Sequence, residues 1–123
     1  MQFEHLKISA KLKKLKPFSA QGPDKISSRL LIEVADTICV PLAIIFEKSM
    51  AEGEVPSDWK KANITPIFKK GSKFLCGNYR PVSLTSIICR IMESLIRDEI
   101  VNHLSLNNLI FSSQHGFMAR RYA

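Results

Sequence analysis

The most constraining feature of the sequence is a pair of strand-type segments on either side of a basic, glycine-containing loop. Residues 62–68 and residues 79–84 are rich in β-branched, apolar and aromatic side chains, which favour extended structure. Gly71 and Gly77 lie between them and mark a turn region at residues 69–78. The pattern predicts an antiparallel β-hairpin.

Each of the two expected strands contains a proline, Pro66 in the first and Pro81 in the second. Proline has no N–H to donate to a sheet ladder, so it is confined to edge strands, bulges and strand starts. We therefore expect edge or bulged strands that pair imperfectly and stay mobile, as in a flap that closes on a ligand.

Positive charge is concentrated on this hairpin and its flanks. The chain has a net charge of +7, and the segment from Trp59 to Met92 alone contains seven basic residues and no acidic one. The bases of the loop and the return strand are Lys69, Lys70, Lys73 and Arg80. Arginine holds phosphate oxygens in a bidentate fork and lysine acts as a point charge, so we expect a polyanionic partner. The alternative is a solvated turn.

Four further segments have helical periodicity. Residues 5–16 predict a short basic helix whose lysine face is either solvated or contacts phosphate. Residues 27–38 predict a helix with Ser27, Ser28 or Asp24 as N-cap. A new helix is expected to begin at Pro41 and end before Gly53. The longest periodic stretch is 87–106. We expect the apolar residues of these helices in the core, with Trp59 as a packed lid over it.

Size and composition indicate one globular domain, with 46% hydrophobic and 24% charged residues in 123. No apolar run is long enough for a membrane span, and no signal or transit pattern begins the chain. We expect an intracellular protein, in the nucleus or the cytoplasm. Cys39, Cys76 and Cys89 are irregularly spaced and predict reduced thiols, with Cys39 and Cys89 buried.

Catalytic machinery is not evident in the residues. The four aspartates have no spacing suited to a two-metal site, and no Walker loop or nucleophile elbow is present. His115 has no orienting partner in sequence. From this chemistry alone we assign no catalytic residue, no metal ligand and no cofactor, and we expect a binding protein.

Six short motifs nevertheless follow one another in a recognisable order. They are Leu12-Lys13-Lys14-Leu15-Lys16-Pro17, Gly22-Pro23-Asp24-x-Ile26, Val55-Pro56-x-x-Trp59-Lys60, Thr65-Pro66-Ile67-Phe68-Lys69-Lys70-Gly71, Asn78-Tyr79-Arg80-Pro81-Val82-Ser83-Leu84 and Gln114-His115-Gly116-Phe117. Over about residues 6–121, the chain resembles the N-terminal part of a non-LTR (LINE-type) retrotransposon reverse transcriptase. The Asn-Tyr-Arg-Pro-Val-Ser-Leu string is the most specific of the six.

The resemblance implies an α+β fold, with helices packed on a short antiparallel β-hairpin as in a truncated fingers subdomain of a right-hand polymerase. It implies that Arg80 and one of Lys69 and Lys70 hold the triphosphate of the incoming dNTP. Residues implied to lie near the template or the nucleotide are Lys73, Gln114, Gly116 and Phe117. The implied partners are an RNA template or DNA, a dNTP, and a palm region that residues 1–123 lack.

Three departures from the family pattern limit what this chain does alone. The Phe-x-Asp and Tyr-x-Asp-Asp blocks, which bind Mg²⁺ in the complete polymerase, do not occur in it. Lys25 stands where glycine is common, and Met118 stands where an arginine is usual. We therefore expect residues 1–123 to be a partial reverse transcriptase domain that begins with a basic helix and linker at residues 1–21. We expect it to be inactive by itself.

A second class of function fits the same residues. A small basic nucleic-acid-binding or protein-interaction module would dock a partner through its apolar helix faces. This alternative predicts self-association in solution and an exposed apolar patch along Ile91, Leu95 and Leu104. The fragment hypothesis predicts a similar patch, because the missing palm would cover it in a full-length protein.

Overall fold

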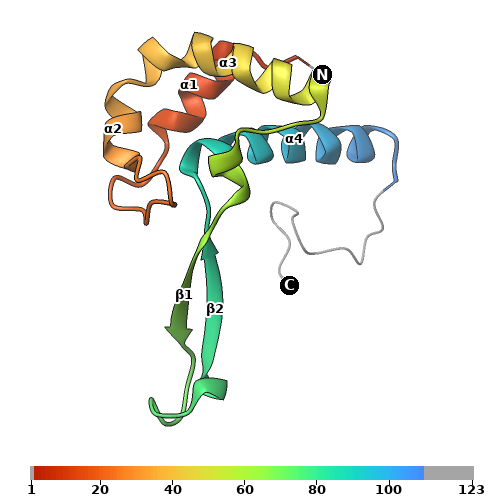
Figure 1. The fold of residues 1–123 in the computed structure, drawn as a ribbon. Helices are drawn as coiled ribbons and strands as arrows, with labels where there is room; N and C mark the ends of the chain where they lie inside the picture. Colours follow the sequence, from red (N-terminus) through yellow and green to blue (C-terminus); the bar gives the residue numbers. More distant parts are fainter. Residues whose placement is uncertain (1, 110–123) are drawn as a thin grey trace. The chain divides into compact units, whose positions relative to one another are not determined.

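The computed structural model describes residues 2–109, which form helices and one two-stranded antiparallel sheet (Figure 1). The elements are α1 (His5–Lys13), α2 (Ser28–Glu33), α3 (Ala35–Glu52), β1 (Asn63–Phe68), β2 (Tyr79–Leu84) and α4 (Ile87–Leu106), with short 3-10 turns η1 (Ser57–Lys60) and η2 (Cys76–Asn78). The chain divides into two compact units, Met1–Met92 and Glu93–Ala123, and α4 crosses the boundary between them.

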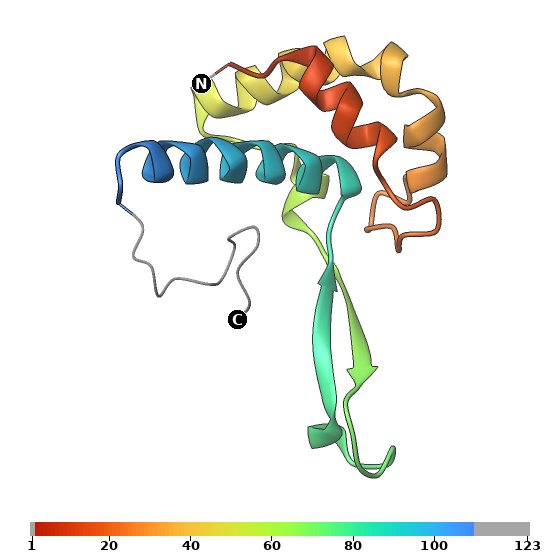
Figure 2. The same cartoon turned by 180° about the vertical axis from the view of Figure 1, so that it is seen from behind.

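The core of the first unit is formed where α1 lies against α3 (Figure 2). Ile8 and Leu12 of α1 are fully buried, as is Phe46 of α3. Burying apolar side chains in this way is the main force that holds such a unit together. The remaining buried apolar side chains of residues 2–92 are Phe3, Leu31, Ala35, Cys39, Leu42, Ile87, Cys89, Ile91 and Met92.

Three aromatic rings meet at one end of this core. The ring centroid of Phe46 lies 5.4 Å from that of Phe3 and 5.8 Å from that of Trp59, and both pairs are edge-to-face. This arrangement is favourable because the positive edge of one ring meets the negative face of the next. Trp59 is half-buried, and its prediction as a lid over the core is confirmed.

The boundary between α2 and α3 was predicted at Pro41, and this was wrong. Pro41 lies inside α3, and the break falls at Val34, whose φ and ψ are −99° and 9°. A proline inside a helix leaves the carbonyl four residues earlier, here that of Thr37, without its helical partner. Thr37 is exposed, so water can satisfy this carbonyl, while the apolar face of α3 stays buried on both sides of the proline. The N-cap of α2 is Ser27, whose hydroxyl accepts from the Leu30 N–H at 3.2 Å.

Not every apolar residue of these helices is in the core, contrary to the prediction. On α3, Val40, Ile44, Ile45 and Met50 are exposed, as is Leu30 on α2. Apolar side chains follow α3 on more than one face, and the described elements cover only one of them.

The helix end predicted at Gly53 is confirmed. Gly53 follows α3 with a left-handed φ of +69°, and its N–H donates to the Ser49 carbonyl at 2.9 Å. After α4, Asn108 takes a left-handed φ of +53°, and the Leu109 N–H donates to the Leu104 carbonyl at 2.9 Å. Left-handed residues of this kind satisfy the last carbonyls of a helix. No helix within residues 2–109 has the length and apolarity to cross a membrane.

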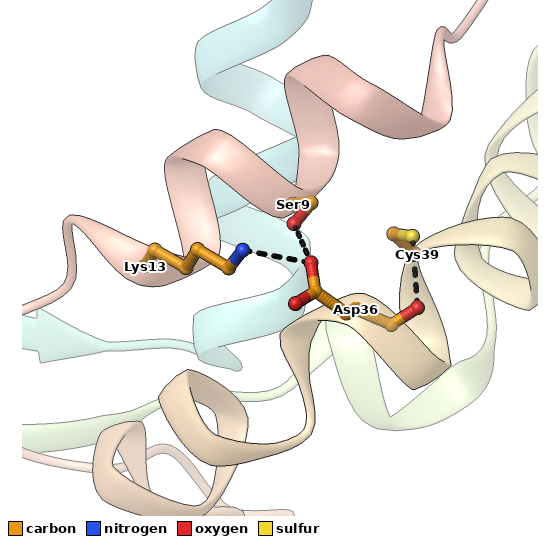
Figure 3. Close-up of polar contacts among 4 residues, drawn as sticks. All are labelled: Ser9, Lys13, Asp36 and Cys39. Carbon is orange, nitrogen blue, oxygen red and sulfur yellow. Dashed lines mark hydrogen bonds and ion pairs between the residues drawn. The ribbon is translucent and has the colours of Figure 1, made fainter.

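A polar contact joins α1 to the first turn of α3 (Figure 3). The Ser9 hydroxyl donates to a carboxylate oxygen of Asp36 at 2.8 Å, and Lys13 Nζ lies 2.8 Å from the same oxygen. The Lys13 hydrogen bond, followed by that of Ser9, holds the pKa of Asp36 below its ordinary value of 3.8. Lys13 of the lysine-rich helix therefore pairs with a carboxylate of the protein.

The lowered pKa of Asp36 predicts how stability changes in acid. The carboxylate stabilises the folded state above its unfolded-state pKa, and this stabilisation is lost as the pH falls through the lower folded-state pKa. Asp36→Asn should reduce stability at neutral pH and flatten the decrease in stability below about pH 4. Urea unfolding across the acid range checks this, with Lys13→Met as the partner variant. Parallel pH curves for wild type and Asp36→Asn would contradict it.

A turn in the linker between α1 and α2 packs against the backbone that leads from β2 into α4. A Cβ on Gly22 would lie 2.5 Å from the carbonyl atoms of Thr85 and 2.6 Å from the Ser86 nitrogen. The Arg90 guanidinium donates to the Ala20 carbonyl at 3.0 Å and ties the same turn to α4. Lys25, which follows in this turn, has a left-handed φ of +58°. Glycine adopts that conformation without strain, whereas a residue with a Cβ does so at a cost.

Candidate nucleic-acid-binding hairpin

The hairpin forms at the predicted residues, but its pairing is regular. β1 and β2 pair in six consecutive positions from Asn63↔Leu84 to Phe68↔Tyr79. The expected imperfect pairing was wrong, since Pro66 and Pro81 lie directly opposite each other in the ladder. Of the two predicted alternatives, edge strands and bulged strands, the first is confirmed, because both strands of a two-stranded sheet are edges. The mobility of the hairpin stays a prediction.

The backbone register explains why both prolines are tolerated. The Lys69 N–H donates to the Asn78 carbonyl at 2.8 Å, one position beyond the last strand pair. Hydrogen-bonded and non-hydrogen-bonded pairs alternate along an antiparallel ladder, which places Pro66 and Pro81 at a non-hydrogen-bonded pair. Their missing N–H groups would have pointed away from the partner strand. The two prolines therefore remove no hydrogen bond between β1 and β2. On the outer edge of each strand, they remove one N–H donor that an added strand would use.

The expected fold has helices packed on the hairpin, but the two strands are largely uncovered. All six residues of β1 are exposed, and in β2 only Tyr79, Val82 and Leu84 are half-buried. Helices α1, α2 and α3 pack on one another. Both faces of the hairpin therefore present side chains to solvent.

One face of the hairpin carries two of the predicted phosphate-binding residues. Arg80 is paired with Ile67, and Lys69 follows two positions later on the same strand as Ile67, so alternation puts both cations on one face. Diagonal neighbours of this kind lie roughly 7–8 Å apart, a spacing that one phosphate group or two adjacent ones can bridge. Both side chains are exposed. Within residues 2–109 neither forms an ion pair with an acidic side chain.

Lys73 lies on the other side of the hairpin. Its Nζ is 5.7 Å from the ring centroid of Phe68, and Phe68 alternates with Ile67 and so faces away from Arg80. Lys70 is in the exposed bend that begins the loop. The four cations were expected near one another, but Lys73 is separated from Arg80 by the sheet itself.

The loop between the strands is held by two side chains whose role was not predicted, Asn78 of the loop and Tyr79 of β2. Asn78 Nδ2 donates to the Ser72 carbonyl at 2.8 Å, and the Tyr79 hydroxyl donates to the Lys73 carbonyl at 2.7 Å. Gly71 has a φ of +85°, and a Cβ there would lie 2.8 Å from Asn78 Nδ2. Asn78 and Tyr79 thus fix the loop that carries the cations. Side-chain amides and hydroxyls near turns signal this role only generally.

The other predicted site residues add little to this hairpin. Gln114, Gly116 and Phe117 lie outside the residues that the structure describes. Cys39 and Cys89 are buried, as predicted, and Cys76 is exposed. Across residues 2–109 no cluster of three or more His, Cys, Asp or Glu side chains is suited to hold a metal ion.

Comparison with known proteins gives an independent test of the resemblance. The chain is 31% identical over 105 residues, 85% of its length, to a protein of Drosophila funebris named RNA-directed DNA polymerase from mobile element jockey. It is 32% identical over 99 residues, 80% of its length, to the protein of the same name from Drosophila melanogaster. No protein-family profile matches the chain.

These alignments cover only 12% and 11% of the two relatives, so the chain spans a small segment of their length. Two relatives with the same name, each aligned over at least four-fifths of this chain, confirm the resemblance that the six motifs indicated. The chain is related to a segment of the RNA-directed DNA polymerases of non-LTR (LINE-type) retrotransposons.

Proposed function

We propose that this chain is a fingers-type piece of a reverse transcriptase whose hairpin binds phosphate groups of nucleic acid or of a nucleoside triphosphate. The observation that carries the proposal is the shared, exposed face of Lys69 and Arg80, neither of which pairs with an acid within residues 2–109. The reverse transcriptase relatives support nucleic acid as the polyanion. The triphosphate role and the template role are part of the proposal.

The chemistry of the face suits the binding of phosphate oxygens. A guanidinium donates two parallel N–H groups to phosphate oxygens, and a nearby ammonium adds a second charge without fixed geometry. The segment from Trp59 to Met92 contains no acid, so no local carboxylate competes for these donors. In a complete polymerase such cations would stabilise charge on the transferring phosphoryl group. By itself the hairpin binds and positions, and we propose that the chain alone is inactive.

The test is the salt dependence of binding by the full chain. For a short labelled oligouridine, log K should fall linearly with log[salt], and Arg80→Ala should reduce the magnitude of that slope by about 1. Arg29→Ala is the matched control, because Arg29 is an exposed arginine on α2. It should leave the slope of the wild type unchanged.

The same salt titration identifies which lysine contributes to phosphate binding. Lys69→Ala should act like Arg80→Ala because the two side chains share a face, whereas Lys70→Ala tests the bend residue. No binding at low salt, or equal slopes for wild type and Arg80→Ala, would overturn the proposal. Competition by a nucleoside triphosphate would distinguish a nucleotide site from a backbone site.

Both the fragment hypothesis and the interaction-module alternative predicted an exposed apolar patch along α4, and this prediction was wrong for both. Ile91 and Leu95 are 6% and 7% exposed, and Leu104 is half-buried. The exposed apolar side chains of α3, including Val40 and Ile44, are a different surface. We propose nucleic-acid binding as the function that the described residues support best.

A further inference from the structure

We infer that the hairpin face opposite Arg80 holds an unpaired nucleobase, so that the protein prefers single-stranded to double-stranded nucleic acid. This inference rests on the proposed function, since it presumes that the hairpin binds nucleic acid. It assigns a ligand to a second face, away from the shared face of Lys69 and Arg80.

The face contains an open apolar groove with a volume of about 430 Å³. Strand residues Ile64, Pro66, Tyr79 and Pro81 form its floor, and Phe74 of the loop borders it. All four floor positions lie on the same face because Pro66 pairs with Pro81 and Tyr79 pairs with Phe68. The volume is within the range of pockets that bind small, flat ligands.

The composition of the groove favours stacking. Phe74 is 96% exposed and Ile64 is 63% exposed, so their apolar surface is available to a ligand. Every nucleobase has a π-face, and stacking on an aromatic side chain contributes about 1–3 kcal/mol per base. A base inside a duplex already stacks on its neighbours and cannot insert into such a groove.

A positive charge at the border of the groove matches the phosphate of a bound nucleotide. Lys73 also lines the groove, and its Nζ lies over the Phe68 ring at 5.7 Å from the centroid. An ammonium beside aromatic and proline surface matches a base with its attached phosphate. The absence of acidic residues between Trp59 and Met92 disfavours a basic peptide in the same place.

The backbone of the hairpin argues against a peptide strand as the occupant. Peptides that add to a sheet use a continuous row of edge N–H and C=O groups, and Pro66 and Pro81 each lack the outward donor. The groove itself is held in shape, because Asn78 and Tyr79 bind the loop carbonyls of Ser72 and Lys73. A preformed groove that offers side chains and few edge donors suits a flat aromatic ligand.

The experiment measures binding of the full chain to three labelled probes of equal length. These are oligouridine, the same strand with abasic sugars, and a duplex. Phe74→Ala should weaken oligouridine binding about tenfold, a value within the range for one stacked base, and should leave duplex and abasic binding unchanged. Phe18→Ala is the matched control, since Phe18 is 89% exposed and lies outside the hairpin.

The outcomes separate this inference from the proposed function. If intact and abasic strands bind equally, or if Phe74→Ala binds oligouridine as the wild type does, the base site is overturned while salt-dependent binding stands. If no probe binds at low salt, both proposals fail. If Phe74→Ala abolishes self-association without affecting any probe, the groove is an interface between copies of this chain, and the base site is overturned.

Discussion

Phe46→Ala should lower the free energy of unfolding by about 3–5 kcal/mol. Phe46 is fully buried and contacts the rings of Phe3 and Trp59 at centroid distances of 5.4 and 5.8 Å. Removing its ring leaves a cavity and also breaks both edge-to-face contacts. Domains of this size are stable by only about 5–15 kcal/mol, so the variant should be largely or wholly unfolded at elevated temperature.

The measurement is urea unfolding followed by circular dichroism and by the fluorescence of Trp59, which reports its own contact with Phe46. The matched control is Ile44→Ala on the same helix, where the side chain is 62% exposed. Surface substitutions of this kind usually change stability by less than about 0.5 kcal/mol. Equal unfolding midpoints for the two variants would contradict the central place of Phe46 in the core.

The elements predicted best from sequence are those whose signals are local. The bounds of β2 and α4 were predicted to the residue, because turn residues and strict periodicity delimit both. The helix break was misplaced at Pro41 because a proline is a strong local signal. The break at Val34 is accompanied instead by a tertiary contact: Asp36, in the first turn of α3, contacts Ser9 and Lys13 of α1. No local pattern contains that contact.

The candidate site was predicted in its residues but not in its geometry. Charge and the family motifs identified Lys69, Lys73 and Arg80, yet only the pairing register places Lys73 on the opposite face. The two prolines led to an expectation of imperfect pairing because a proline's effect depends on which rung it occupies. Whether a proline occupies a hydrogen-bonded or a non-hydrogen-bonded pair depends on the register between the two strands. The composition of either segment does not determine that register.

The last expected result concerns the turn that joins the linker between α1 and α2 to the backbone ahead of α4. Gly22→Ala should destabilise the first unit by about 3 kcal/mol, at the upper part of the usual range for overpacking. The new Cβ would lie 2.5 Å from the carbonyl atoms of Thr85 and 2.6 Å from the Ser86 nitrogen. Backbone atoms cannot rotate out of the way as a flexible side chain can, so one segment must move.

Gly77→Ala is the control, because a Cβ on Gly77 would meet no atom within 4 Å. It should unfold as the wild type does in urea. If the contact also positions the hairpin, Gly22→Ala should weaken oligouridine binding under conditions where the chain is still folded, because Thr85 directly follows β2. Equal stability of the two alanine variants would show that the linker turn does not pack against Thr85 and Ser86. The glycine of the Gly-Pro-Asp motif would then need an explanation other than close backbone approach.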